Sequence, residues 1–197
     1  MGFLSAILRG ILYVYVCLYI LMYLAFMFVI DSVHMSVSVK SMFVVVMPFA
    51  ILVVIQKFVL RTSVNRNTEK KQMLGVMIVG CILLLVCTAQ LSMNTYTSKF
   101  NQDRWLHAEE KRVHMVDDLM QKYKLTGKSN EEITTLLGTP TETRNGEEGI
   151  ITSYYLGNER GFISIDSEQL VLQFDRDGRV MEYKKKLYVI ASFYIPI

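Results

Sequence analysis

The sequence predicts three transmembrane α-helices followed by a small extracytoplasmic α+β domain, in which two helices precede a three- or four-stranded antiparallel sheet. Three long apolar stretches, almost without charges, lie in the first half of the 197 residues. The charged residues, 20% of the whole chain, gather in the second half. There the apolar residues first recur at helical spacing and then alternate along the chain. The first half therefore has the pattern of a membrane domain and the second that of a soluble domain.

Residues 1–93 are expected to form the membrane domain, with spans at about 11–30, 42–60 and 73–93. Each stretch has about the 20 residues that a helix needs to cross a hydrocarbon core ~30 Å thick. Pro48 lies in the middle of the second stretch and predicts a kink there. The first stretch lacks the small-residue cleavage site of a signal peptide and the cysteine of a lipoprotein signal, so we expect it to stay in the membrane.

The basic residues predict how the spans are oriented. The connection between the second and third spans holds Arg61, Arg66, Lys70 and Lys71, whereas the connection between the first two holds only Lys40. Because cytoplasmic loops carry an excess of Lys and Arg, the second connection is expected in the cytoplasm, together with the N-terminus. Three spans then place the second half of the chain outside, and we expect a multi-pass protein of a bacterial cytoplasmic membrane.

Charge and cysteine placement argue against several classes of function. The net positive charge belongs to the membrane half, so it does not predict nucleic-acid binding, and the bilayer itself is the expected partner of that half. Cys17, Cys81 and Cys87 all lie in apolar stretches without a paired spacing, which argues against a zinc site or a disulfide framework. No predicted span contains a buried Asp, Glu or Arg, the usual mark of an ion path.

The second half divides into a linker at residues 94–102, a folded domain at 103–186 and an apolar tail at 187–197. The tail is too short to span a membrane and follows three consecutive lysines, a run that suits anionic lipid. Three interpretations of the tail stay open: an extra strand, a segment lying in the membrane interface, or a contact for a partner.

Two helices are expected in the folded domain. The first covers Asp103–Lys124, and its part Leu106–Arg112 is mostly polar and expected to be exposed to solvent. The second begins after Ser129, whose spacing from Glu132 predicts a capping box, and ends at Gly138. The apolar residues that define the first helix are Leu106, Val113, Val116, Leu119 or Met120, and Tyr123.

An antiparallel sheet is expected after the polar stretch Thr141–Gly149, because the apolar period then changes to two. Asp175–Gly178 predicts a hairpin turn between the last two strands, in which glycine supplies a positive φ. In this arrangement each helix can cover one face of the sheet. The expected strands are Ile150–Leu156, Phe162–Asp166, Gln169–Asp175 and Arg179–Lys185.

The segments LTGKSNEEITTLLGTPTET (residues 125–143) and YYLGNERGFISIDSEQLVLQFDRDGRV (residues 154–180) resemble the SmpA/OmlA (BamE-type) domain family, whose fold is also repeated in the β-lactamase inhibitor proteins. The most specific part is the run Gly-x-Ser-x-x-Glu-x-x-x-Leu-Leu-Gly-x-Pro. The resemblance implies two helices on an antiparallel sheet, and a role in binding other proteins without catalysis. Known members assemble outer-membrane barrels as lipoproteins or inhibit enzymes through the sheet. With three spans and no lipoprotein cysteine, this chain looks more like membrane-tethered relatives.

No catalytic residue, metal site or cofactor is expected. His107, Glu110 and His114 have the side chains and the helical spacing that a metal accepts, but one helix offers only two such ligands in reach of the same ion. A solvated face is the preferred interpretation. Ser129 is better explained as a helix cap than as a nucleophile, and no nucleophile or phosphate-binding motif is found in the sequence.

Tyr155, Arg160 and Phe162 are the expected binding residues, because Tyr, Phe and Arg most often carry the energy of protein interfaces. They lie on or beside the predicted hairpin 154–162, where Tyr154 points to the opposite face. The alternative is that they only complete the sheet and its turn. The expected function is a membrane-anchored extracytoplasmic protein-binding module that serves as an envelope assembly or regulatory subunit, with another envelope protein as partner. An accessory subunit of a membrane transport complex and an enzyme of unfamiliar type are the alternatives.

Overall fold

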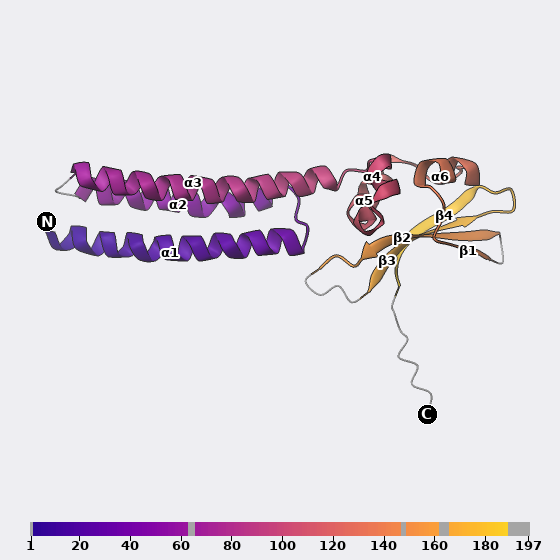
Figure 1. The fold of residues 1–197 in the computed structure, drawn as a ribbon, viewed down its shortest axis with the longest axis horizontal. Helices are drawn as coiled ribbons and strands as arrows, with labels where there is room; N and C mark the ends of the chain where they lie inside the picture. Colours follow the sequence, from indigo (N-terminus) through magenta and orange to yellow (C-terminus); the bar gives the residue numbers. More distant parts are fainter. Residues whose placement is uncertain (1, 63–65, 147–148, 162–165, 189–197) are drawn as a thin grey trace, which may run out of the picture. The chain divides into compact units, whose positions relative to one another are not determined.

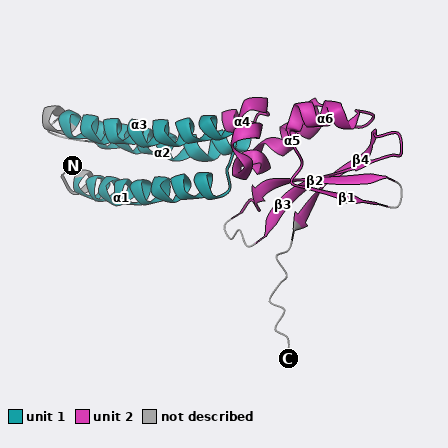
Figure 2. Cartoon of the chain, turned by 45° about the vertical axis from the view of Figure 1, so that its right-hand side comes forward, with its two compact units in different colours: residues 1–95 teal, residues 96–197 magenta. Residues whose placement is uncertain are grey.

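The computed structural model describes residues 2–62, 66–146, 149–161 and 166–188. The chain forms two compact units, Met1–Thr95 and Tyr96–Ile197 (Figure 2). The first consists of long helices, and the second combines short helices with a sheet.

The first unit is built from α1 (Gly2–Ser32), α2 (Val39–Thr62) and α3 (Arg66–Thr97), drawn from indigo to magenta in Figure 1. All three are long enough and apolar enough to cross a membrane. The predicted layout of three apolar helices before the mixed unit is therefore confirmed. Pro48 lies within α2, and α3 continues through residues 94–97, which were expected in the linker.

Three tyrosines spaced one helical turn apart, Tyr15, Tyr19 and Tyr23, tie α1 to its neighbours. Their hydroxyl groups donate hydrogen bonds to backbone carbonyls in the middle of α2 and α3, where few other polar groups could accept them. The acceptors are the carbonyl oxygens of Pro48, Gly80 and Val45, at 2.7, 2.9 and 2.5 Å respectively. The packing of α1 against α2 and α3 therefore explains why these three hydroxyl groups lie in a row inside an apolar bundle.

The last turn of α3 holds the connection between α1 and α2. The Asn94 side-chain amide donates to the carbonyl oxygens of Ile30 and Met35, at 3.0 and 3.1 Å. The backbone N–H of Val37 donates to the Thr95 hydroxyl oxygen at 2.7 Å. These bonds hold the end of α1 and the connection to α3, and the Ile30 carbonyl oxygen also accepts the Met35 N–H at 3.0 Å.

The second unit contains short helices followed by a four-stranded antiparallel sheet in the order β1-β2-β3-β4. This confirms the predicted layout of helices before an antiparallel sheet. All neighbouring strands are also consecutive in the sequence, so the sheet is a simple meander. The elements are α4 (Gln102–His107), the 3₁₀ helix η1 (Glu109–Lys111), α5 (Arg112–Lys122), α6 (Asn130–Leu137), β1 (Glu142–Asn145), β2 (Ile150–Asn158), β3 (Ser167–Phe174) and β4 (Val180–Tyr188).

The prediction of one continuous helix over Asp103–Lys124 is wrong. The chain leaves the helical conformation at Ala108, where φ is −133° and ψ is 71°, and resumes through η1 into α5. The break turns both Trp105 and Arg112 inward, with exposed fractions of 0% and 3%. The expectation that Leu106–Arg112 is solvated is therefore also wrong for Arg112.

The polar stretch Thr141–Gly149, where no strand was predicted, contains β1. All four residues of β1 are exposed at the edge of the sheet. The strand therefore lacks the alternating apolar pattern by which a strand is recognised in a sequence. In the expected strand Phe162–Asp166, residues 162–165 lie outside the described residues. Asp166 itself precedes β3, and its carbonyl oxygen accepts a hydrogen bond from the Glu159 N–H at 2.8 Å.

The structure confirms the predicted capping box at Ser129, the end of the helix at Gly138 and the turn at Gly178. The Ser129 hydroxyl accepts the Glu132 N–H at 3.2 Å, and the Glu132 carboxylate accepts the Ser129 N–H at 2.9 Å. That backbone hydrogen bond from Ser129 lowers the pKa of Glu132. Gly138 ends α6 with a φ of +80°, and Gly178 has a φ of +74° in the turn between β3 and β4.

The core of the second unit lies between the helices and one face of the sheet. Both views place α4, α5 and α6 on the same side of the strands (Figures 1 and 2). The helices thus share one face of the sheet, whereas the sequence had allowed one helix for each face. The fully buried residues of this core include Trp105, Val116, Leu119, Ile133, Leu137, Leu156, Leu170 and Leu172.

Candidate functional site

The face of the sheet that points away from the helices is the candidate site, and we call it the open face. Side chains alternate between the two faces of a strand, and paired residues on neighbouring strands share a face. Since Tyr154, Leu170 and Leu172 point into the core, the residues between them belong to the open face. The pairing arranges it as three rows: Arg144, Ile151, Gln173 and Glu182; Glu142, Ser153, Val171 and Lys184; and Tyr155, Gln169 and Lys186.

The open face is charged and shallow. Its basic residues, Arg144, Lys184 and Lys186, are all exposed, and Lys184 lies 3.4 Å from the Glu182 carboxylate. A depression of about 60 Å³ between these side chains has Ile151 and Val171 in its lining. Cavities that enclose small ligands measure about 300–1,000 Å³, so this surface suits contact with another macromolecule better than a small substrate.

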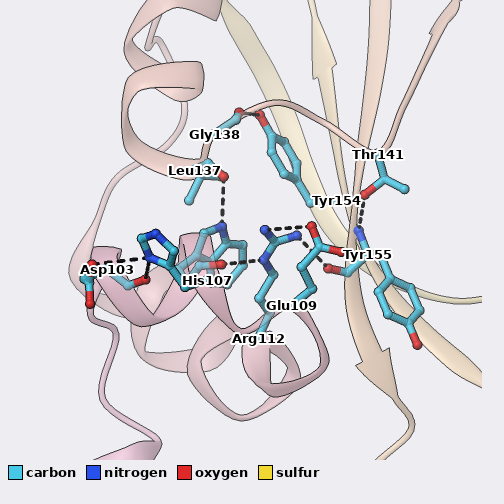
Figure 3. A network of polar contacts seen from close by, with 10 residues as sticks. Asp103, His107, Glu109, Arg112, Leu137, Gly138, Thr141, Tyr154 and Tyr155 are labelled. Carbon is cyan, nitrogen blue, oxygen red and sulfur yellow. Dashed lines mark hydrogen bonds and ion pairs between the residues drawn. The ribbon is translucent and has the colours of Figure 1, made fainter.

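Tyr155 is the predicted binding residue that lies on the open face. Its side chain is half-buried, whereas that of Tyr154 is buried, so the two tyrosines take the faces that the sequence predicted. In Figure 3 the Tyr155 ring points away from the Tyr154 ring and from the buried contacts beside it. Its hydroxyl group donates to the Asn158 side-chain oxygen at 3.4 Å, and its backbone N–H donates to the Thr141 hydroxyl at 3.0 Å.

Arg160 lies on the helix side, apart from Tyr155. Its guanidinium contacts the Asp117 carboxylate of α5 at 2.7 Å and the Glu168 carboxylate at 3.6 Å. Lys185 also contacts Asp117, at 2.5 Å. Although burial opposes both shifts, these contacts raise the pKa of Arg160 and lower the pKa of Asp117. Arg160 is therefore engaged in joining the strands to α5.

Phe162, the third predicted binding residue, lies outside the described residues. The structure thus places Tyr155 on the open face and Arg160 on the covered side, so these two described residues do not share one patch. The residues that surround Tyr155 on the open face, above all Lys186 on β4, were not singled out in the sequence. The strand register provides that information, because Tyr155 pairs with Gln169 and Gln169 pairs with Lys186.

On the helix side of the sheet, a buried polar network joins α4, η1, α5, α6 and β2 (Figure 3). The Arg112 Nε donates to the Trp105 carbonyl oxygen at 2.7 Å, and its Nη1 donates to the Tyr155 carbonyl oxygen at 3.3 Å. Its third contact is the Glu109 carboxylate at 3.4 Å. Burial lowers the pKa of Arg112, while the charge of Glu109 acts in the opposite direction. The network therefore satisfies a buried guanidinium with one acid and two carbonyl groups.

Two further hydrogen bonds close this network. The Trp105 indole N–H donates to the Leu137 carbonyl oxygen at 3.1 Å, and the Tyr154 hydroxyl donates to the Gly138 carbonyl oxygen at 3.1 Å. Burial raises the pKa of Tyr154 to about 12, so its hydroxyl stays a donor at neutral pH. Both acceptors belong to the end of α6, whose carbonyls lack partners within the helix. The network therefore positions β2, and with it Tyr155.

Gly157 allows η1 to approach β2 closely. It follows an irregularity in the pairing of β2 with β3 and has a φ of +116°. A Cβ atom at this position would lie only 2.3 Å from the backbone oxygen of Glu110. A side chain here would therefore force η1 away from the strand.

The residues considered as metal ligands lie on three separate elements. His107 ends α4, Glu110 belongs to η1 and His114 to α5, so the helical spacing that suggested a shared face does not exist. His107 lies 3.3 Å from the Asp103 carboxylate, and its Nδ1 lies 2.8 Å from the Asp103 carbonyl oxygen. Within the described part of the chain, no group of three or more His, Cys, Asp or Glu side chains is placed to hold a metal ion.

Comparisons with known proteins found no matching family model, no matching curated protein and no matching solved structure. The resemblance of residues 125–143 and 154–180 to the SmpA/OmlA family therefore rests on the residues of the motif alone. In the structure, residues 127–140 of that motif form the capping box, α6 and its glycine end. Each of these features has a local physical reason, so they support a helix of this kind without identifying a family.

Proposed function

We propose that this protein is a membrane-anchored protein-binding module whose second unit lies outside the cytoplasmic membrane of a bacterium. Its partner is another envelope protein, and it acts as an assembly or regulatory subunit. The open face of the sheet carries the proposal, because it combines exposed charges with an aromatic side chain, and the depression of about 60 Å³ between its charged side chains is too small to enclose a substrate. Such a surface is typical of contacts between proteins, in which a Tyr commonly serves as an anchor.

Two further observations support binding as the function. The motif shared with the SmpA/OmlA family implies a domain that binds proteins without catalysis. The buried network around Arg112 holds the backbone of β2 by a hydrogen bond to the Tyr155 carbonyl, which keeps the strand beneath the open face in place. A rigid strand lowers the entropy that a surface loses on binding. The titratable groups of this network are engaged with one another and with backbone groups, an arrangement that suits a structural role.

The membrane placement is supported by the three apolar helices and by the uneven distribution of Lys and Arg between their connections. We expect an alkaline-phosphatase fusion after Lys186 to be active, because this enzyme folds only outside the cytoplasm. A fusion after Leu60, in the basic connection, should be inactive. Activity measured in whole cells checks both fusions, and the reverse pattern would contradict the proposed orientation.

Removing the anchors of the open face should weaken partner capture without destabilising the domain. We expect the double variant Tyr155→Ala, Lys186→Ala to lose most crosslinked partner in native membranes, since truncation of a central aromatic anchor costs about 2 kcal/mol or more of binding. Both side chains are at least partly exposed, so the free energy of unfolding should change by only about 0.5 kcal/mol. Crosslinking followed by mass spectrometry measures capture, and urea unfolding measures stability.

The matched control is Lys124→Ala, Glu131→Ala, which removes two exposed side chains outside the sheet. This control should retain full capture. Equal capture by the open-face variant and the control would contradict the assignment of the open face. Capture that depends only on the membrane helices would favour a subunit of a transport complex instead.

A further inference from the structure

A groove of about 460 Å³ lies along the side of the helical bundle. Val16 and Ile20 of α1 form one wall, Val76 and Val79 of α3 form the other, and Leu52 contributes from α2. Gly75 also lines the groove, and a Cβ atom added to it would meet no other atom within 4 Å. The absence of a side chain at this position therefore leaves the space open.

The chemistry of this groove is almost wholly apolar. Its polar members are Tyr13, Tyr19 and Gln72, and the Tyr19 hydroxyl already donates to the Gly80 carbonyl oxygen at 2.9 Å. A ligand that fills the groove must therefore be a hydrocarbon along most of its length, because a polar group placed there would lose its hydrogen bonds to water.

Basic residues mark one end of the groove. Tyr13 and Gln72 are the lining residues nearest to the start of α1 and of α3. One turn before Tyr13 on the same side of α1 is Arg9, and Lys71 directly precedes Gln72, one turn before Gly75. Two cations on two different helices thus lie beside the same end of an apolar groove, whereas the lining of its other end offers no charge.

We propose that this groove is a binding site for an anionic phospholipid. One acyl chain lies along Val16, Ile20 and Val76, and the phosphate contacts Arg9 and Lys71. Basic pockets between membrane helices bind anionic head groups in this way, and the cytoplasmic leaflet, where this end lies in the proposed orientation, supplies such lipids. The inference requires that the three helices lie in a bilayer, and it does not depend on protein binding by the open face.

The size of the groove favours an acyl chain over a helix of a partner. A helix with its side chains is about 10–12 Å wide and rises 1.5 Å per residue, so the part lying beside Gln72–Gly80 occupies roughly two to three times the volume of the groove. An extended hydrocarbon chain is much thinner. The two cations also match a phosphate group, whereas a helix facing this end would need acidic residues at the membrane surface.

Photolabelling of the full chain in nanodiscs tests the proposal. The nanodiscs consist of phosphatidylcholine with a minor fraction of phosphatidylglycerol that carries a photoreactive group on one acyl chain, and mass spectrometry locates the adducts. We expect adducts on the lining segments 16–20 and 76–79. Arg9→Gln with Lys71→Gln should lower labelling roughly tenfold or more, since each basic residue near an anionic lipid contributes about fivefold.

Gly75→Leu should abolish labelling of the groove, because its side chain fills the open space while both cations remain. The matched controls are Gly10→Leu, a second glycine with no atom within 4 Å of an added Cβ, and Lys40→Gln near the start of α2. Both controls should label like the unchanged protein. Equal labelling by a phosphatidylcholine probe, adducts spread evenly over the three helices, or unchanged labelling of Gly75→Leu would each overturn the proposal.

Discussion

Leu137→Asp is expected to abolish folding of the unit Tyr96–Ile197. Leu137 is fully buried between α6 and the sheet, and its carbonyl oxygen accepts the Trp105 indole N–H. A carboxylate at this position loses its hydration without gaining a partner, which costs several kcal/mol even if it becomes protonated. Domains of this size are stable by only about 5–15 kcal/mol in total. Urea unfolding followed by circular dichroism should show a cooperative transition for the unchanged unit and none for the variant.

The controls for Leu137→Asp distinguish the effect of burying a charge from the effect of replacing the leucine. Leu137→Met keeps the volume and should cost less than about 1.5 kcal/mol. Thr135→Asp places the same charge on an exposed position of the same helix and should change the free energy of unfolding by only about 0.5 kcal/mol. A cooperative transition of Leu137→Asp at the unchanged urea concentration would show that α6 does not pack on the sheet.

Trp105→Ala is expected to lower the free energy of unfolding by about 3–5 kcal/mol, as large aromatic residues do when they are removed from a core. Its side chain is fully buried, and its ring lies 5.7 Å from that of Phe100 between centroids. The Arg112 guanidinium lies 5.4 Å from the Trp105 ring, so the change leaves a buried charge beside a cavity. The shift of the urea midpoint of the isolated unit measures the effect.

Trp105→Phe separates the contribution of the indole hydrogen bond from that of the buried aromatic ring. The variant retains an aromatic ring but cannot donate to the Leu137 carbonyl, so a loss of about 1–3 kcal/mol is expected. Leu106→Ala, at the neighbouring exposed position, serves as the control. If Trp105→Ala and Leu106→Ala shift the midpoint equally, the indole is not part of the core.

Elements with local causes were predictable from the sequence. The three membrane-length helices follow from uninterrupted apolar stretches, and α6 follows from the Ser129 cap and the Gly138 end. The turn at Gly178 and the opposite faces of Tyr154 and Tyr155 follow from strand alternation and from the conformational freedom of glycine. In each case the controlling residues are close to one another in the sequence.

Features that depend on distant residues were not predictable. The helix break at Ala108 and the burial of Arg112 depend on acceptors in Trp105 and Tyr155, and the second of these lies 43 residues away. The polar edge strand β1 forms only because β2 offers backbone partners. Arg160 was expected to be a binding residue at the tip of the hairpin, and its position on the helix side follows from its contacts with carboxylates on α5 and β3. The spacing of residues along the sequence does not predict such contacts.

Site-specific crosslinking in native membranes tests most directly whether the open face binds another envelope protein. A photoreactive amino acid replaces Lys184 in the middle of the open face, and in a second variant it replaces the exposed Glu131 on α6. We expect a discrete adduct with one envelope protein from position 184, which is lost in the Tyr155→Ala, Lys186→Ala background, and no such adduct from position 131. Adducts of equal yield from both positions, or from position 131 alone, would contradict this expectation.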